Sequence, residues 1–349
     1  MEISNLLIIW HKENDRELPW KSEKNPYKIW VSEILLQQTR VMQAKSYYHN
    51  FICVYPSVQI FANAPLDDIL RLWQGLGYYS RARNMHAAAK QVLAEFGGTF
   101  PQSMCELSRL KGVGPYTAAA IAAFAYDEPV VALDGNAYRV LARLFAEPCP
   151  IHTPAAHKVF SHLGQNLLQN IPSSLFNQAM MDFGSLVCTP NPKCVDCPLS
   201  NHCMACLQNK VVEFPVKTAK KIPRHRYFYY LHITQDEHLF IQQRLQKDIW
   251  QNLYQFPLIE TDSALSVESL FTHPDWTTIL GVQTPQVIGY TPPYIHRLTH
   301  QIIHAVFIRI VLENESMWLQ KHCKKIRPLQ IDKLGISRLM ERYLLGEPV

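Results

Sequence analysis

The sequence has no run of apolar residues long enough to cross a bilayer, so it predicts a chain without a membrane-spanning helix and without a membrane partner. Its first ten residues also lack the basic, apolar and small-residue succession of a secretory signal, and we therefore expect an intracellular protein. Internal repeats and low-complexity tracts are absent too, which argues against a repeat architecture and against a disordered chain.

A large excess of charge of one sign is also missing. Lys and Arg number 34 against 29 Asp and Glu, and the net charge of +5 is only a mild hint of a polyanionic partner. Length and composition say more, because 349 residues with 48% hydrophobic side chains predict about two domains with full cores. Nine cysteines in a chain without a secretion signal favour metal or cluster chemistry over disulfides.

The spacing of apolar residues divides the chain into two parts. Residues 1–209 predict helices at 29–43, 66–73, 80–95, 118–124 and 155–170, because apolar residues recur there every three or four positions. Residues 210–226 hold six basic residues, one acidic residue and two prolines, which predicts a solvated linker. Alternation then predicts strands at 227–233, 238–245 and 304–312. The predicted fold is an all-α domain followed by an α+β domain at 227–349.

Two glycines and a downstream aspartate form the most informative short motif. In Gly112-Val113-Gly114-Pro115-Tyr116 the glycines allow a tight turn whose backbone N–H groups lie at a helix N-terminus. Such a turn suits a phosphate oxygen, because the unpaired amides and the helix dipole both favour an anion. A plain interhelical turn is the alternative, and the carboxylate of Asp134 further along favours the functional interpretation.

The glycine turn and Asp134 resemble the helix-hairpin-helix of the endonuclease III superfamily of DNA glycosylases. Further segments narrow the resemblance to the MutY-type adenine DNA glycosylases, closely over roughly residues 5–205 and more loosely beyond. These segments are Leu18-Pro19-Trp20, Pro26 to Trp30, Ser32 to Thr39, Gly75 to Asn84 and Asn177 to Gly184. The resemblance implies a monomer that binds duplex DNA in the cytoplasm or with the nucleoid.

Cleavage of the bond between adenine and its sugar puts positive charge on the sugar and negative charge on the departing base, so it needs a carboxylate and a proton donor. The resemblance implies that Glu33 is the general acid toward adenine and that Asp134 stabilises the sugar cation. Asn136 and Tyr116 lie at positions that assist them in relatives. The apolar neighbours of Glu33 predict a pocket that raises the pKa of its carboxyl group, and a solvent-facing helix residue is the alternative.

An adenine inside a duplex must be flipped out before it can be excised. By the resemblance, Gln38, Leu76 and Tyr78 intercalate or fill the gap, and Thr39 lies near the 8-oxoguanine opposite the adenine. Asp182, on the helix before the cysteines, matches an acidic position that contacts adenine in relatives. Core packing is the alternative for Leu76 and Tyr78.

Four cysteines, Cys188, Cys194, Cys197 and Cys203, are separated by five, two and five residues. Several thiolates in one short loop can enclose a [4Fe–4S] cluster, and relatives carry such a loop after the same helix, with a first gap of six residues where this chain has five. Cys206 adds a Cys-x2-Cys pair with Cys203, so zinc held by the last four of these five cysteines is the alternative.

Residues 227–349 resemble the Nudix-like domain with which MutY enzymes recognise 8-oxoguanine. The resemblance rests on Trp250 to Pro257 and on the pair Thr299-His300 before a strand, and it implies lesion contacts by Thr299 and His300. A Nudix hydrolase also needs a helix of paired acidic residues to hold Mg²⁺ near a pyrophosphate. Between Pro257 and Pro285 the acidic residues are only scattered, so we expect no such hydrolysis.

Tyr116 discriminates between two mechanisms. Relatives with lyase activity have a lysine at this hairpin position, and its amine forms a Schiff base with the sugar, which a phenol cannot do. The sequence therefore resembles monofunctional enzymes that excise adenine opposite 8-oxoguanine or guanine. A pyrimidine-damage glycosylase and lyase of endonuclease III type is one alternative, and a non-catalytic DNA- or nucleotide-binding module is another.

Overall fold

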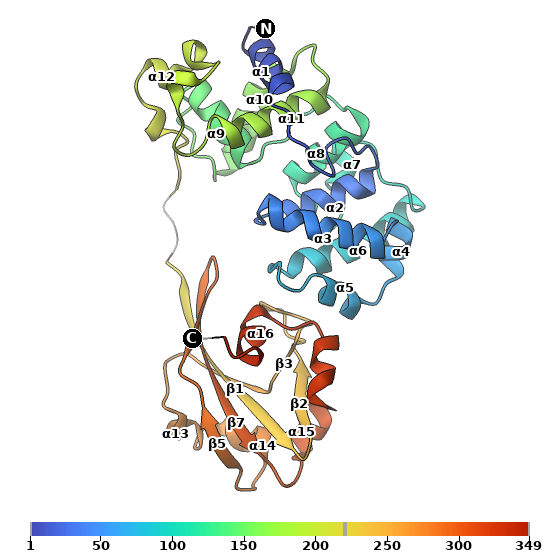
Figure 1. The fold of residues 1–349 in the computed structure, drawn as a ribbon, viewed down its shortest axis with the longest axis vertical. Coiled ribbons are helices and arrows are strands. Elements are labelled where there is room, and N and C mark those ends of the chain that lie inside the picture. Colours follow the sequence, from blue (N-terminus) through green and yellow to red (C-terminus); the bar gives the residue numbers. More distant parts are fainter. Residues whose placement is uncertain (1, 219–221, 348–349) are drawn as a thin grey trace. The chain divides into compact units, whose positions relative to one another are not determined.

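The computed structural model describes residues 2–218 and 222–347 of the chain. Its contacts divide the chain into two compact units, Met1–Asn63 with Asn84–Ala219 and Ala64–Arg83 with Lys220–Val349 (Figure 1). The first unit is helical and the second combines a sheet with short helices. This confirms the predicted fold class of an all-α domain and an α+β domain. Among the described residues, no helix is both long and apolar enough to cross a membrane.

The first unit packs around an alanine-rich helix, α8, in which every residue from Thr117 to Ala123 is buried. Helices α2 and α11 pack on α8, and α11 also packs on α9. The long helices of this unit are α1 (Glu2–Glu13), α2 (Pro26–Leu36), α3 (Val41–Val54), α8 (Pro115–Tyr126), α9 (Gly135–Leu144), α10 (Pro154–Leu168) and α11 (Ser173–Leu186). The short ones are α4 (Val58–Asn63), α7 (Met104–Leu107) and α12 (Met204–Leu207). Helix α6 (Ser80–Phe96) begins in the second unit and continues in the first.

The helix predicted at 29–43 is in fact two helices. Helix α2 ends at Leu36 and α3 begins at Val41, with Gln38 between them at a φ of 58°. A left-handed residue cannot continue an α-helix, so the chain turns here although the apolar spacing runs on. The turn places Gln38 and Thr39 in a loop, where their side chains are not held on a helix face.

The segment predicted as a solvated linker is partly packed. Residues Val211–Glu213 form the 3-10 helix η3, Phe214 joins the core of the first unit, and strand β1 already begins at Arg224. The guanidinium of Arg143 donates to the carbonyls of both Val211 and Phe214. The six basic residues of the segment predict exposure to solvent. A single buried aromatic side chain and a few backbone contacts nevertheless suffice to hold part of it against the first unit.

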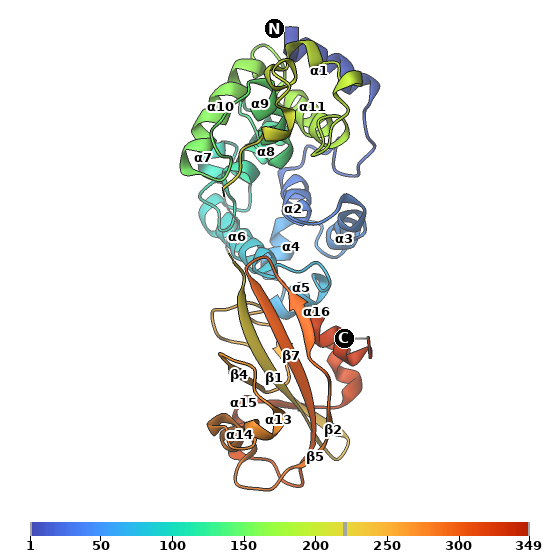
Figure 2. The same ribbon diagram turned by 90° about the vertical axis from the view of Figure 1, so that its left-hand side faces the viewer.

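The second unit is built on two long parallel strands, β1 (Arg224–Gln235) and β7 (Gln301–Val311), which pair from Arg224 with Gln301 to Thr234 with Val311 (Figure 2). The sheet order is β3-β2-β1-β7-β5, with β4 paired to β1, β6 to β7 and β8 to β2. The remaining strands are β2 (His238–Gln243), β3 (Tyr254–Gln255), β4 (Leu258–Thr261), β5 (Gln286–Tyr290), β6 (Tyr294–Arg297) and β8 (Lys324–Ile326). The three predicted strands correspond to β1, β2 and β7.

Short helices complete the second unit. They are α5 (Leu66–Leu72), α13 (Val267–Leu270), α14 (Pro274–Leu280), α15 (Met317–His322), the 3-10 helix η4 (Pro328–Lys333) and α16 (Arg338–Leu344). Apolar side chains of β1 and β7 form one core with Trp276 and Ile279 of α14.

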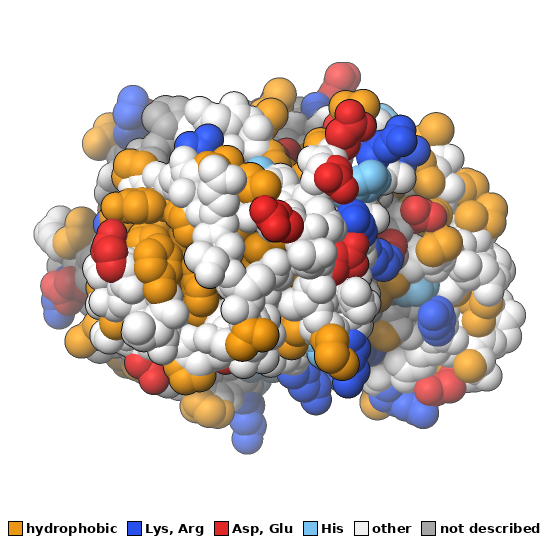
Figure 3. Space-filling model, turned by 90° about the horizontal axis from the view of Figure 1, so that it is seen from below, with side chains coloured by type: hydrophobic (Ala, Val, Ile, Leu, Met, Phe, Trp, Pro, Cys, Tyr) orange, Lys and Arg blue, Asp and Glu red, His pale blue; other side chains and the backbone are white. Residues whose placement is uncertain are grey.

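On the face shown in Figure 3, acidic, basic and hydrophobic side chains are interspersed, so the small positive net charge is not gathered into one basic surface there.

Candidate active site

The glycine turn joins α7 to α8 as a hairpin. Gly112 has a φ of 76°, and a Cβ at this position would lie 2.6 Å from the Cβ of Asn84. Only glycine satisfies both constraints without strain. Gly114 caps α8, and nothing lies within 4 Å of where its Cβ would be. The open space over Gly114 leaves the N-terminal end of α8 accessible to a ligand.

Glu33 lies on α2 and is buried, with 5% of its surface exposed. The hydroxyl of Tyr116, from the first turn of α8, donates to Oε2 of Glu33 at 2.6 Å. Burial raises the pKa of Glu33 to about 7, the hydrogen bond from Tyr116 opposes this rise, and the charge of Asp134 adds to it. Glu33 is therefore a carboxyl group that holds or releases a proton near neutral pH.

Asp134 is fixed by its place at the N-terminus of α9. Its Oδ1 accepts from the backbone N–H of Ala137 at 2.7 Å, and its Oδ2 accepts from Nδ2 of Asn136 at 2.7 Å. Burial raises the pKa of Asp134, while these donors and the charge of Arg139 lower it. The same N-cap bonds that begin the helix also favour the ionised carboxylate.

Asn136 is itself held from two sides. Nη2 of Arg139 donates to Oδ1 of Asn136 at 2.7 Å and to the carbonyl of Gly184 at 2.7 Å. Nε of Arg139 donates to the carbonyl of Cys188 at 2.7 Å. Helix α11 can approach α9 this closely because residue 184 is a glycine. A Cβ at this position would lie 2.5 Å from the Cβ of Asn136. A chain of hydrogen bonds thus connects Asp134 to the first cysteine of the cysteine loop.

One cavity of about 520 Å³ brings six of the predicted site residues together. They are Glu33, Gln38, Thr39, Tyr116, Asp134 and Asn136. Arg16, Trp20, Lys21 and Gln178 also line this cavity, and none of them was singled out for a role from the sequence. The signal was nevertheless present, since the Leu-Pro-Trp segment and the segment from Asn177 to Gly184 were both part of the resemblance. A pocket with a neutral-range carboxyl, an ionisable carboxylate and basic walls suits acid-assisted cleavage of a bond to a heterocycle.

Both units of the chain are similar to known proteins. Residues 31–162 match the HhH-GPD superfamily of base excision DNA repair proteins, and residues 228–346 match the NUDIX domain. The adenine DNA glycosylase of Buchnera aphidicola subsp. Baizongia pistaciae is 39% identical over 317 residues, covering 90% of this chain and 87% of that protein. That of Buchnera aphidicola subsp. Schizaphis graminum is 33% identical over 311 residues, covering 88% and 87%. The chain belongs to the adenine DNA glycosylases. A solved thermostable thymine-DNA glycosylase is 27% identical, with a TM-score of 0.55 over 59% of this chain and 95% of that one.

Membership in this family makes the chain a DNA repair glycosylase, which is a hydrolase that binds DNA. Its helical unit carries the cavity just described, and the matched NUDIX domain lies in the second unit.

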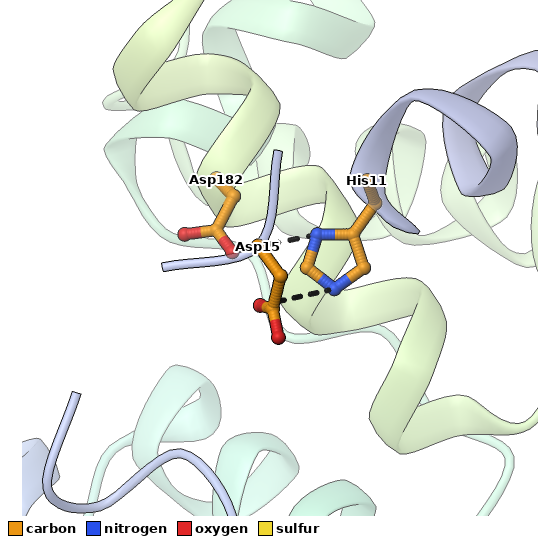
Figure 4. A group of neighbouring side chains, drawn as sticks. All are labelled: His11, Asp15 and Asp182. Atoms are coloured by element: carbon orange, nitrogen blue, oxygen red, sulfur yellow. Dashed lines mark ion pairs between the residues drawn. The ribbon is translucent and has the colours of Figure 1, made fainter. Parts of the chain in front are cut away.

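Asp182 is not among the residues that line the cavity, and its predicted contact with adenine stays a prediction. The residue is fully buried, and its carboxylate lies among side chains of the same unit, including His11 and Asp15 (Figure 4). Nε of Arg16 donates to its Oδ1 at 2.8 Å, and Nζ of Lys21 donates to its Oδ2 at 2.8 Å. Lys21 also pairs with Asp15. Because the protein's own cations occupy these carboxylates, we assign no metal here and regard Asp182 as the residue that positions Arg16 and Lys21.

Four predicted lesion-binding residues belong to the second unit. The hydroxyls of Tyr78 and Thr299 lie 2.7 Å apart, and with His300 they line a cavity of about 310 Å³. Tyr78 is 45% exposed and has a φ of 46°, whereas Leu76 is buried. The alternative of core packing therefore suits Leu76 better than it suits Tyr78. The cavity also includes Trp250, whose φ of 57° is unusual for a bulky residue.

All four predicted cluster ligands line one small apolar cavity, together with Cys206 and Arg143. Nη1 of Arg143 donates to Sγ of Cys188 at 3.4 Å and to the carbonyl of Thr189 at 2.6 Å. Burial raises the pKa of Cys197 to about 11. An all-sulfur donor set around a small apolar cavity, with a buried guanidinium beside it to offset thiolate charge, fits an iron–sulfur cluster.

Proposed function

We propose that this chain excises adenine opposite 8-oxoguanine or guanine in duplex DNA, as a monofunctional monomer. The observation that carries the proposal is the convergence of Glu33, Tyr116 and Asp134 on one cavity, with the pKa of Glu33 near 7. The similar proteins are adenine DNA glycosylases, and the assignment of each role rests on the chemistry of these side chains.

In the proposed mechanism the flipped adenine enters the cavity and Glu33 donates its proton to a ring nitrogen of the base. A carboxylic acid with a pKa near the working pH is the most effective proton donor of this kind. Bond cleavage leaves positive charge on the sugar, which the ionised Asp134 stabilises, because its two donors hold the carboxylate in place. Glu33, now ionised, accepts a proton from the attacking water. Two carboxyl groups in different environments thereby divide the acid and the anion roles.

Tyr116 limits the chemistry to hydrolysis. Its phenol is partly buried, and burial raises its pKa well above the ordinary value, so it remains a neutral hydrogen-bond donor to Glu33. It has no amine with which to form a Schiff base. Strand cleavage therefore needs alkali or a second enzyme.

The cysteine loop is the proposed site of a [4Fe–4S] cluster, bound by Cys188, Cys194, Cys197 and Cys203, with zinc as the alternative occupant. A bound cluster would crosslink the loop and lower the thiol pKa values by coordination. Arg139 then connects this loop to Asn136, since it donates to the carbonyl of Cys188 and to the side chain of Asn136. The loop is in this way a support for the position of Asp134.

The second domain, predicted at 227–349, is proposed to read the 8-oxoguanine. Thr299 and His300 of this domain, together with Tyr78 from the segment Ala64–Arg83 of the same unit, supply an aromatic face and several hydrogen-bonding groups around one cavity. Replacing both Thr299 and His300 with alanine should reduce the preference for 8-oxoguanine over guanine. Thr272→Ala/His273→Ala is a matched control, because it removes the same two side-chain types elsewhere in the unit. An unchanged preference in the Thr299/His300 variant would refute the assignment.

The experiment that tests the proposed function is single-turnover excision on four duplexes, with and without alkali afterwards. Three duplexes pair adenine with 8-oxoguanine, guanine or thymine, and the fourth carries an oxidised pyrimidine. We expect fast adenine release opposite 8-oxoguanine, with strand breaks only after alkali. Cleavage of the oxidised pyrimidine without alkali would mean an enzyme of endonuclease III type and would overturn the role given to Tyr116.

A further inference from the structure

Gln301 adjoins the two residues that are proposed to contact the lesion. Thr299 and His300 form the tip of the hairpin between β6 and β7, and Gln301 is the first residue of β7. The backbone N–H of Leu298 donates to the carbonyl of Gln301 at 2.8 Å, and that of Arg224 donates to the carbonyl of His300 at 3.0 Å. Gln301 is partly exposed and lines the cavity of about 310 Å³ that Thr299 and His300 also line. The fold therefore holds an amide side chain at the wall of the proposed lesion site.

Arg226 fixes which way this amide points. Arg226 is only 7% exposed, and its guanidinium makes five hydrogen bonds. Two reach Glu260, two reach Asp248, and the fifth reaches Oε1 of Gln301 at 2.9 Å. All five N–H groups of the guanidinium are thus used, and the two carboxylates hold it in place. Because arginine has no acceptor, the amide of Gln301 presents its oxygen to Arg226 and not its nitrogen.

The amide nitrogen of Gln301 is consequently left as a donor. Nε2 carries two N–H groups and accepts no hydrogen bond. Within residues 2–218 and 222–347, it donates to no group of the protein. The hydroxyl of Thr299 differs, because it is shared with the hydroxyl of Tyr78 at 2.7 Å and either oxygen can be the donor. Gln301 thus brings a polar group of fixed hydrogen-bonding direction to this cavity.

Guanine and 8-oxoguanine differ at an atom that such a donor can recognise. Guanine has an acceptor at N7 and a C–H at position 8, whereas 8-oxoguanine has an N–H at N7 and a carbonyl oxygen, O8, at position 8. We propose that Nε2 of Gln301 donates a hydrogen bond to O8 of 8-oxoguanine, which makes Gln301 a specificity-determining residue. The inference rests on the proposed function, in which the second domain reads the lesion. A guanine in the same place leaves the N–H of Gln301 facing a C–H, and a site built for a hydrogen bond rejects a partner that lacks it.

The experiment measures single-turnover excision of adenine opposite 8-oxoguanine, guanine and 8-bromoguanine, whose bromine fills position 8 without a carbonyl oxygen. Gln301→Glu keeps an oxygen for Arg226, but its ionised carboxylate cannot donate to O8. Gln301→Met removes the donor without adding a charge. Gln286→Glu is the matched control, because it makes the same change at an exposed position of β5 in the same unit.

We expect the ratio of the rates opposite 8-oxoguanine and guanine to fall in both Gln301 variants. The fall should be roughly 2- to 10-fold in Gln301→Met, the usual weight of one hydrogen bond, and at least as large in Gln301→Glu. The control should keep the wild-type ratio, and rates opposite 8-bromoguanine should follow those opposite guanine. Equal losses opposite all three bases would show that Gln301 only supports the fold, and a higher ratio would show that Nε2 binds N7 of guanine. Either result refutes the contact with O8.

The Thr299→Ala/His300→Ala variant separates this inference from the proposed function. If that variant loses the preference for 8-oxoguanine while both Gln301 variants keep it, the donor role fails and lesion reading by the second domain stands. If all three variants keep the wild-type preference, the proposed lesion reading fails together with the inference.

Discussion

Replacing Glu33 with glutamine should stabilise the protein while it abolishes most of its activity. The carboxyl group is buried and its pKa rises from 4.5 to about 7. Such a rise corresponds to about 3 kcal/mol of free energy between the two protonation states. Below about pH 4.5 the group is protonated in both folded and unfolded chains and costs nothing. As the pH rises the unfolded chain ionises first, so the folded state loses stability until the loss is complete above about pH 7.

Glutamine has nearly the same shape, accepts the hydrogen bond of Tyr116 and never ionises. The variant should therefore match the wild type near pH 4.5 and exceed its free energy of unfolding at pH 8 by up to about 3 kcal/mol. Excision should fall by roughly 10²- to 10⁴-fold, the usual contribution of a general acid. Glu95→Gln, at an exposed helix position, is the control and should change neither quantity.

Urea unfolding at pH 4.5 and pH 8 measures the difference, because the change of midpoint at constant slope reports stability. Hydrogen exchange of α2 and α8 confines the measurement to the unit that carries Glu33, since the chain has two units and need not unfold in one step. If the stability gain of the variant is the same at both pH values, burial does not raise the pKa of Glu33. Excision near the wild-type rate would instead remove Glu33 from the acid role.

Three further outcomes test the geometry of the first unit. Tyr116→Phe removes a hydrogen bond that lowers the pKa of Glu33, so the fall of the single-turnover rate with rising pH should shift to higher pH, and a shift to lower pH would contradict the contact. Gly184→Ala places a Cβ against Asn136, so it should cost about 1–3 kcal/mol of stability and lower the excision rate at saturating DNA. Wild-type kinetics in this variant would show that the close approach of α11 to Asn136 is not needed. Gly112→Ala should lower the free energy of unfolding by about 1–2 kcal/mol through its left-handed backbone, as calorimetry would detect, and an unchanged melting temperature would contradict it.

The fold class and the composition of the site could be predicted from the sequence because their signals are local. Apolar spacing marks helices and strands, the glycine turn marks the hairpin, and the resemblance identified Glu33 and Asp134 without reference to space. The errors were equally physical. The spacing of apolar residues carries no information about a single residue with left-handed backbone, here Gln38, so α2 and α3 were predicted as one helix. Phe214 was placed in a linker because basic residues around it outweighed one aromatic.

What only the tertiary structure decided is which groups meet. Residues 33 and 116 are far apart in sequence, and the packing of α2 on α8 brings their side chains into a hydrogen bond that opposes the rise in the pKa of Glu33 caused by burial. The same holds for Asp182, whose sequence position predicted a ligand contact. Its carboxylate is buried, and Arg16 and Lys21 compensate its charge, because a carboxylate removed from water must be paired. The sequence by itself determined the chemical groups of this protein, and packing determined their environments, since desolvation and pairing depend on neighbours in space.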